Sequence, residues 1–194
     1  MTARAQRLFT PDEYLSIERN SQFKSEYVAG KIYAMAGASY AHNLITGNVV
    51  GEFYTQLKGR PCSTVPSDMR VAVSSTGLYT YPDVTVVCGE PQFLDGRRDV
   101  LLNPTVIVEV LSPSTEDYDR GEKCANYRRL ASLTDYLLVA QHRRSVDHYT
   151  RLGNNEWLLK ESTSSDGDEI LPSIGCTLRL ADIYDKVPLP IAQV

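Results

Sequence analysis

Residues 105–111, with the sequence TVIVEVL, give the strongest strand signal in the chain. Their β-branched side chains favour extended backbone, and the apolar run suits a strand that is buried on both faces of a sheet. Such a strand needs other elements packed over each face, which requires a layered domain. Glu109 is the one charged residue in the run, and a buried carboxylate is costly unless a partner compensates for it. The segment therefore predicts a central sheet with a compensated charge inside it.

Helix and strand signals alternate along the rest of the chain. Thr10, Pro11 and the acids that follow are typical of a helix start, and the predicted helix covers residues 11–18. Ser39 begins a second helix, in which apolar residues recur at three- and four-residue steps until Gly59. The other expected elements are strands at 31–35, 62–66, 69–73, 81–88 and 136–141, hairpins around 28–31 and 153–155, a helix from 114 to about 130, and a final helix at 181–186.

This order predicts the fold class α/β or α+β, with a central mixed β-sheet flanked by helices and additional N-terminal and C-terminal hairpins. A length of 194 residues without a low-complexity linker predicts one domain over residues 1–194. The chain shows no secretory signal and no apolar run of roughly 18 residues, so we expect a cytoplasmic protein without a membrane segment.

Charge and cysteine content exclude some classes of function. The formal net charge of −4 argues against a broadly basic nucleic-acid coat, although a local basic groove stays compatible with it. The four cysteines are Cys62, Cys88, Cys124 and Cys176. They form no C-x-x-C pair, so a zinc cage is not expected. In a cytoplasmic protein we expect them to be reduced thiols with structural roles.

Two carboxylates stand next to apolar strand signals. Asp83 follows Pro82 and precedes an apolar run, and Glu109 lies within the strongest strand. Their spacing allows one strand, a loop and a neighbouring strand, so both acids could face one cation. Mg²⁺ prefers one or two carboxylates together with water and phosphate oxygens. The alternative is that each acid pairs with an arginine or caps a loop.

Residues 81–84 (YPDV) and 107–115 (IVEVLSPST) resemble the core of the restriction-endonuclease-like superfamily, whose signature is P-D, a spacer and D/E-x-K. Residues 8–187 more narrowly resemble the restriction-endonuclease proteins of the Uma two family. The resemblance implies a three-layer α/β/α core and Mg²⁺-dependent hydrolysis of phosphodiester bonds in DNA, with Mn²⁺ as a substitute ion. It also implies a homodimer. Other stretches that resemble the family are 23–27, 30–32, 39–43, 66–70, 119–123 and 136–139.

The chain departs from the superfamily pattern at the lysine. The lysine of D/E-x-K would stand at position 111, which is Leu111 here. The resemblance implies a lysine that has migrated to the following helix, and Lys123 is the matching residue. A helix packed on the strand could bring its ammonium to the same place, where it would orient the attacking water or stabilise charge on phosphorus. The alternative is an exposed lysine that pairs with Asp119.

Several further residues are candidates for the site. Glu26 matches an acid of the family, and the alternative is a surface glutamate before a hairpin. Asp68 is a weaker acidic candidate. His42, with Asn43, heads the second helix and could contact phosphate, or it could be a local cap. Candidate substrate-binding residues are Gln141 and Arg128, with Arg129, Arg143 and Arg144 as further basic residues that could grip a phosphate backbone or be solvated.

Three functional hypotheses follow. The first is a Mg²⁺-dependent DNA endonuclease with Asp83, Glu109, Lys123 and Glu26 as catalytic residues and the first two as metal ligands. The second is a nuclease fold without catalysis that binds nucleic acid or protein. The third is hydrolysis by Ser112 or Ser114, which is disfavoured because no G-x-S-x-G motif is present.

Overall fold

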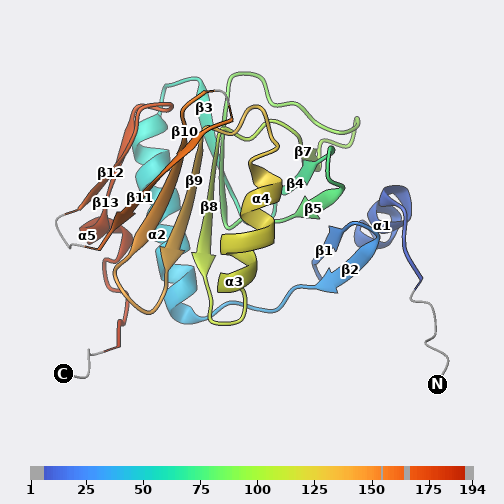
Figure 1. The fold of residues 1–194 in the computed structure, drawn as a ribbon, viewed down its shortest axis with the longest axis horizontal. Coiled ribbons are helices and arrows are strands. Elements are labelled where there is room, and N and C mark those ends of the chain that lie inside the picture. The colour runs from blue at the N-terminus through green and yellow to red at the C-terminus, as the bar shows by residue number, and fades with distance from the viewer. Residues whose placement is uncertain (1–6, 154, 164–166, 191–194) are drawn as a thin grey trace.

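The structure, a computed structural model, describes residues 7–153, 155–163 and 167–190. Its larger sheet has the order β11-β10-β9-β8-β6-β3 and is mixed, since β8 and β9 run parallel whereas the other neighbours are antiparallel (Figure 1). Its strands are β3 (Cys62–Pro66), β6 (Val84–Cys88), β8 (Val106–Leu111), β9 (Asp135–Ala140), β10 (Val146–Arg151) and β11 (Trp157–Ser162).

A smaller sheet has the order β2-β1-β5-β4-β7, and a separate pair joins β12 to β13. The strands of the smaller sheet are β1 (Ser25–Val28), β2 (Lys31–Ala34), β4 (Arg70–Val73), β5 (Leu78–Thr80) and β7 (Val100–Leu101). The separate pair is β12 (Asp168–Leu171) and β13 (Cys176–Arg179). The helical elements are α1 (Pro11–Glu18), α2 (Tyr40–Leu57), α3 (Glu116–Tyr118), the π-helical turn η1 (Asp119–Lys123), α4 (Cys124–Tyr127) and α5 (Leu180–Ile183).

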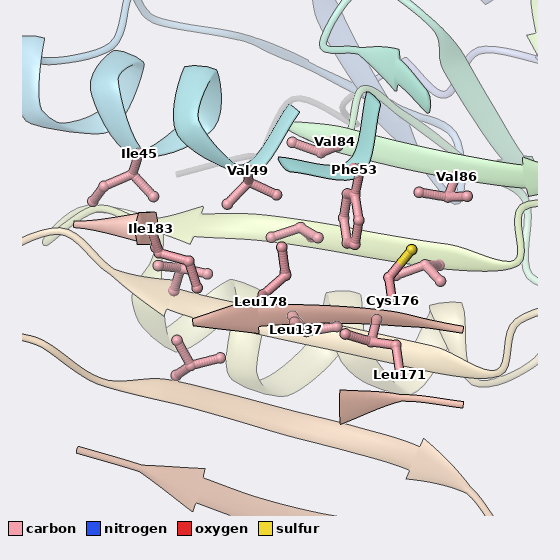
Figure 2. Packing of buried hydrophobic residues seen from close by; sticks show 14 of the residues in the cluster. Ile45, Val49, Phe53, Val84, Val86, Leu137, Leu171, Cys176, Leu178 and Ile183 are labelled. Carbon is pink, nitrogen blue, oxygen red and sulfur yellow. The ribbon is translucent and has the colours of Figure 1, made fainter. Parts of the chain in front are cut away.

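Alternate side chains of β8 belong to two hydrophobic cores on opposite faces of the larger sheet. Val106, Val108 and Val110 pack with α2, α5 and β13 on one face. Figure 2 shows this core, with Phe53 of α2 and Leu178 of β13 among the labelled residues. Ile107 and Leu111 pack on the other face with residues of α4 and of the smaller sheet. Every residue of β8 is buried, as expected for a strand covered on both sides. The three-layer, mixed-sheet α+β architecture predicted from the sequence is confirmed.

The first two helices begin where their caps predict. Thr10 and Glu13 form a capping box at the start of α1, in which each side chain accepts a hydrogen bond from the other residue's backbone N–H. The Ser39 side chain accepts from the His42 N–H and starts α2. The predicted hairpin at 28–31 joins β1 to β2. The hairpin joining β10 to β11 is also present, although Asn154 at its turn lies outside the described residues.

Two predicted elements differ in the structure. The strand expected at 81–88 begins only at Val84, as β6 of the larger sheet, whereas β5 ends at Thr80 before the expected strand and pairs within the smaller sheet. Pro82 lies between them and has no N–H to donate to a ladder. The helix expected from 114 to about 130 is α3, η1 and α4 in succession, and the π turn buries both Asp119 and Lys123. The strands β5, β7, β12 and β13 were not predicted.

The expectation of four reduced thiols is wrong for two of them. Cys62 and Cys88 are directly opposite in the β3–β6 ladder and form a disulfide with Cα atoms 4.0 Å apart. Facing antiparallel residues come close enough for such a bond even when they are far apart in sequence. Cys124 and Cys176 are free and buried. No helix in the described residues has the length and hydropathy needed to cross a bilayer.

A buried charged cluster joins β12 to the larger sheet. His148 Nε2 lies 2.7 Å from Asp135 Oδ1, and its Nδ1 lies 3.0 Å from Glu169 Oε2. All three side chains are buried. Burial lowers the pKa of His148, but the hydrogen bonds and charges of the two carboxylates outweigh this and raise that pKa to about 9.

This pKa predicts a loss of stability at alkaline pH. A raised histidine pKa contributes stability that is fully present below about pH 6.5 and is lost as the pH rises through about 9, a contribution on the order of 3 kcal/mol. Urea unfolding at pH 6 and pH 9.5 should therefore show a His148→Gln penalty that shrinks at the higher pH. The exposed His142→Gln is the control. A penalty that is equal at both pH values would contradict the prediction.

Candidate functional site

A cavity of about 1050 Å³ opens at the ends of β6 and β8. The β1–β2 hairpin, the start of α2 and the α3–η1 segment provide its other walls. Acidic side chains are concentrated in it, and those that line it are Glu26, Asp83, Glu109, Asp119 and Glu122. Glu26 lies in β1, Glu109 lies in β8 and Asp83 directly precedes β6, so the sheets themselves position the cluster.

Asp83 and Glu109 come together through the β6–β8 register. Val84 is opposite Val108, and continuing this antiparallel register by one residue places Asp83 opposite Glu109. The Val110 N–H donates to Asp83 Oδ2 at 2.7 Å, which fixes the aspartate at the edge of β8. Glu109 is only 3% exposed. Burial raises the pKa of Glu109 well above its usual value; Lys123 opposes that shift, whereas Asp83 and Asp119 add to it.

Lys123 lies among three carboxylates. Its Nζ is 2.9 Å from Glu109 Oε1, 3.2 Å from Glu26 Oε1 and 3.3 Å from Asp119 Oδ1. The side chain is buried, so the alternative of an exposed helix lysine is wrong. Burial opposes the charge, but the three acids raise the pKa of Lys123 above its ordinary value, and the group is therefore an ammonium. A helix packed on β8 thus brings a lysine to the acid pair although Leu111 occupies the usual position.

Glu26 is buried in this cluster and is not a surface glutamate. It is 9% exposed, accepts a hydrogen bond from Thr80 Oγ1 and pairs with Lys123. Tyr127 is a member of the site that was not predicted, and its hydroxyl donates to Glu109 Oε1 at 2.8 Å. The spacing could have indicated it, because Asp119, Lys123 and Tyr127 recur at four-residue steps and such residues share one helix face.

His42 and Gln141 also line the cavity. His42 Nε2 lies 3.2 Å from Asp83 Oδ2, so the histidine is joined to the acid pair rather than solvated. Its Nδ1 is buried and has no hydrogen-bond partner among the described residues. Ser39 Oγ donates to Gln141 Oε1 at 2.6 Å, which ties the end of β9 to the N-terminus of α2.

Other predicted residues lie away from the cluster. Arg128 and Arg129 are exposed at the end of α4 and do not line the cavity. The Asp68 side chain is 86% exposed and pairs with Lys24 at 2.6 Å. Ser112 and Ser114 lie at the cavity with their Oγ atoms 3.0 Å apart.

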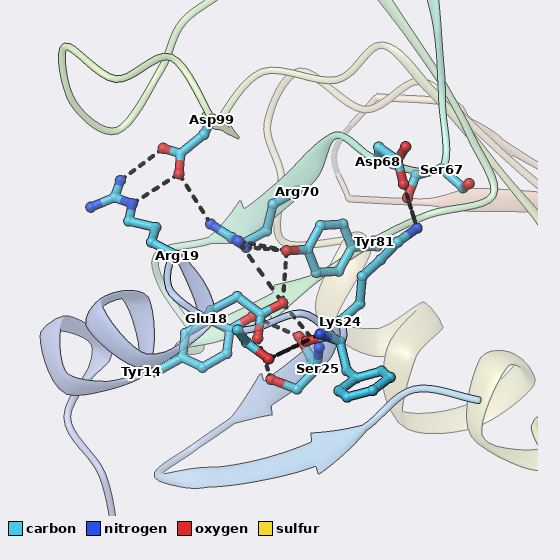
Figure 3. Close-up of polar contacts among 12 residues, drawn as sticks. Tyr14, Glu18, Arg19, Lys24, Ser25, Ser67, Asp68, Arg70, Tyr81 and Asp99 are labelled. Atoms are coloured by element: carbon cyan, nitrogen blue, oxygen red, sulfur yellow. Dashed lines mark hydrogen bonds and ion pairs between the residues drawn. The ribbon is translucent and has the colours of Figure 1, made fainter. Parts of the chain in front are cut away.

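A second polar network, centred on Glu18, holds the segments that carry two of the acids, and Figure 3 shows its side chains. The Glu18 carboxylate accepts the Ser25 N–H at 3.0 Å and the Tyr81 hydroxyl at 2.8 Å. Arg70 Nε in turn donates to the Tyr81 oxygen at 3.1 Å. Ser25 directly precedes Glu26, and Tyr81 lies two residues before Asp83. One buried glutamate therefore holds both acid-bearing segments.

The donor set suits a hard divalent cation. Asp83 and Glu109 offer carboxylate oxygens from adjacent strands. The contacts described above are made by Asp83 Oδ2 and by Glu109 Oε1, so they do not use Asp83 Oδ1 or Glu109 Oε2. The described residues contain no group of three or more histidine, cysteine or acidic side chains arranged for a metal ion. Mg²⁺ commonly takes only one or two carboxylates and completes its shell with water and phosphate oxygens. The acid pair therefore fits such an ion as a half-site.

Known proteins match most of this chain. The Uma2 family, described as "Putative restriction endonuclease", matches residues 11–181. The Synechocystis sp. protein sll1609 is 37% identical over 161 residues, which are 83% of this chain and 91% of that protein. The Synechocystis sp. protein slr1290 is 38% identical over 175 residues, 90% of each chain.

A solved structure shows the same fold. It is a crystal structure titled as a "putative nuclease belonging to DUF820" from Anabaena variabilis ATCC 29413, and it superposes with a TM-score of 0.77 at 18% identity. The match covers 92% of this chain and 99% of that chain. Because the family model also matches most of the chain, the protein belongs to the Uma2 family of restriction-endonuclease-like proteins.

Proposed function

We propose that this protein is a metal-dependent endonuclease that hydrolyses phosphodiester bonds in DNA. The observation that carries the proposal is a buried ammonium, Lys123, held 2.9 Å from Glu109 beside a second strand-end carboxylate, Asp83, in an open cavity. Membership in a family described as "Putative restriction endonuclease" supports the same class of reaction.

Asp83 and Glu109 would hold Mg²⁺, with Mn²⁺ as a substitute. When bound there, such an ion neutralises charge on the phosphate and lowers the pKa of water. The Val110 N–H and the Tyr127 hydroxyl keep one oxygen of each carboxylate in place, which leaves the other oxygen for the cation. The two ligands are therefore oriented before an ion arrives.

Lys123 would act on the reacting phosphate. Its ammonium, oriented by Glu26 and Asp119, would place the attacking water and stabilise the charge that develops on phosphorus. Leu111 cannot do this, because its side chain has no charge or hydrogen-bond donor and is buried in the apolar core. His42 lines the cavity beside Asp83 and would contact a phosphate oxygen or water there.

Substrate contacts beyond the acid cluster belong to the same proposal. Gln141 lines the cavity and would contact the strand next to the scissile phosphate. Arg128 lies outside the cavity, so it would contact only a more distant part of the DNA backbone. We also propose a homodimer, in which two such cavities would face one DNA molecule.

A catalytically inactive binding module is the second candidate. The observation that favours it is the pairing of Lys123 with three acids, because the lysine already binds carboxylate oxygens that a metal ion would otherwise take. Such a module would keep the cavity and bind nucleic acid or protein without turnover.

Metal dependence distinguishes the two. Supercoiled plasmid DNA and single-stranded circular DNA are the substrates, and at least one of them should be cleaved in Mg²⁺ or Mn²⁺ and stay intact in EDTA. Titration calorimetry with Mg²⁺ alone should show binding. Binding of Mg²⁺ with no cleavage under either ion would favour the inactive module, and cleavage that persists in EDTA would exclude the proposed chemistry.

A further inference from the structure

One wall of the cavity is a single face of the β1–β2 hairpin. Glu26 is directly opposite Tyr33 in this ladder, and facing residues of an antiparallel pair project their side chains to the same side. The Met35 N–H donates to the Lys24 carbonyl at 3.0 Å, so the pairing continues toward the cavity rim. Lys24, Glu26, Tyr33 and Met35 all line the cavity. Because Glu26 reaches Lys123, Tyr33 lies beside the acid cluster.

The aromatic rings on this wall are open to solvent. Tyr33 is 51% exposed and Phe23, in the loop before β1, is 79% exposed. Both line the cavity. Large aromatic side chains are mostly buried in proteins, and rings exposed next to a polar site are typical of surfaces that stack nucleic-acid bases.

The cavity offers few free cations to a phosphate backbone. Among the described residues that line it, the basic side chains are Lys24, Lys123 and His42, and no arginine is present. Lys24 is paired with Asp68 and donates to the Ser67 carbonyl, while Lys123 is surrounded by acids. Duplex and single-stranded nucleic acids both bind partly through neutralised phosphates, but only a single strand also offers unpaired base faces for stacking. This site is therefore better suited to contacting bases than to gripping a double helix.

We propose that Tyr33 and Phe23 form a stacking surface for the unpaired bases of a single-stranded nucleic acid. A base stacked on Tyr33 places its neighbouring phosphate over Asp83, Glu109 and Lys123. In a duplex the base faces are covered by neighbouring base pairs, so this surface selects single-stranded or locally unpaired substrate. The assignment rests on the proposed function for the reaction itself but makes a separate claim about binding.

Fluorescence anisotropy tests the claim in EDTA, where cleavage is absent. The probes are a fluorescein-labelled 16-nucleotide oligo-dT, an oligo-U of the same length and a blunt 16-base-pair duplex. Oligo-dT should bind at least about tenfold more tightly than the duplex. Tyr33→Ala and Phe23→Ala should each raise the Kd for oligo-dT about tenfold. Equal binding of oligo-U would extend the surface to RNA.

Two matched variants control for aromatic loss in general. Tyr33→Phe keeps the ring and should stay within about twofold of wild type. Tyr54→Ala removes a tyrosine that is 67% exposed on α2 and does not line the cavity, and it should also have no effect. Light scattering on each variant reports the oligomeric state.

Several outcomes would overturn the inference. They are unchanged oligo-dT binding by Tyr33→Ala, duplex binding as tight as that of oligo-dT, no binding of any probe, or a weakened affinity that accompanies dissociation of a dimer. If wild type cleaves DNA but Tyr33→Ala binds oligo-dT normally, the inference fails and the proposed function stands. If oligo-dT binds through Tyr33 but no metal supports cleavage, the proposed function fails and the stacking surface stands.

Discussion

Asp83→Asn is expected to lower the rate of Mg²⁺-dependent DNA cleavage by at least about 10³-fold, equivalent to about 4 kcal/mol of transition-state stabilisation. The amide keeps the size of the carboxylate and an oxygen that can still accept the Val110 N–H, so the strand edge is preserved. The negative charge that would hold the cation is lost. Single-turnover cleavage measures the effect, and calorimetry should show a weaker Mg²⁺ affinity in the same variant.

Asp68→Asn is the matched control for this loss. Asp68 is an aspartate of the same region, but its side chain is 86% exposed and does not line the cavity. Its cleavage rate should stay within about twofold of wild type. The metal assignment would be wrong if Asp83→Asn cleaved at the rate of Asp68→Asn while both variants remained folded.

Lys123→Met is expected to abolish cleavage and to lower the free energy of unfolding by about 3–5 kcal/mol, as measured by urea denaturation at neutral pH. The substitution keeps an unbranched side chain but removes the cation that compensates Glu26, Glu109 and Asp119. Buried carboxylates without a cation repel each other and lack the solvation that water would give them. A stability effect of this size would show that Lys123 alone supplies the positive charge that stabilises the buried acids.

A double variant separates this explanation from a packing defect. Lys123→Met combined with Glu109→Gln removes the cation together with the carboxylate nearest to it, so it should recover part of the lost stability. Lys31→Met, at an exposed lysine of the hairpin, should change the free energy of unfolding by less than about 0.5 kcal/mol. If the double variant were no more stable than Lys123→Met alone, lost packing rather than unpaired charge would explain the result.

The elements that the sequence predicts well are those with local physical causes. The capping box at Thr10 and Glu13 starts α1 by its own hydrogen bonds, and the β-branched run of β8 is buried as its composition indicates. Asp83 and Glu109 were linked from their positions at two strands, and the β6–β8 register brings them together. Lys123 was placed from a family resemblance, and its burial agrees with that placement.

The features that sequence reasoning missed depend on long-range pairing. The disulfide requires Cys62 to face Cys88 across a ladder, which no local pattern specifies. The separation of β5 from β6 results from pairing in two different sheets, and the second strand therefore begins at Val84 rather than at Tyr81. Tyr33 lies within the strand predicted at 31–35, but only its pairing opposite Glu26 places it at the cavity. These features follow from the tertiary arrangement rather than from propensity.

The hydrogen bonds of Glu18 determine how much of the chain the site requires. It does not line the cavity, yet its carboxylate joins the segment before Glu26 to the segment before Asp83. The two cores of the larger sheet contain no residue of α1, which packs instead with the smaller sheet. The cores of the larger sheet can therefore form without α1, whereas the placement of the acids requires it. A fragment that lacks α1 would fold but would not catalyse the reaction.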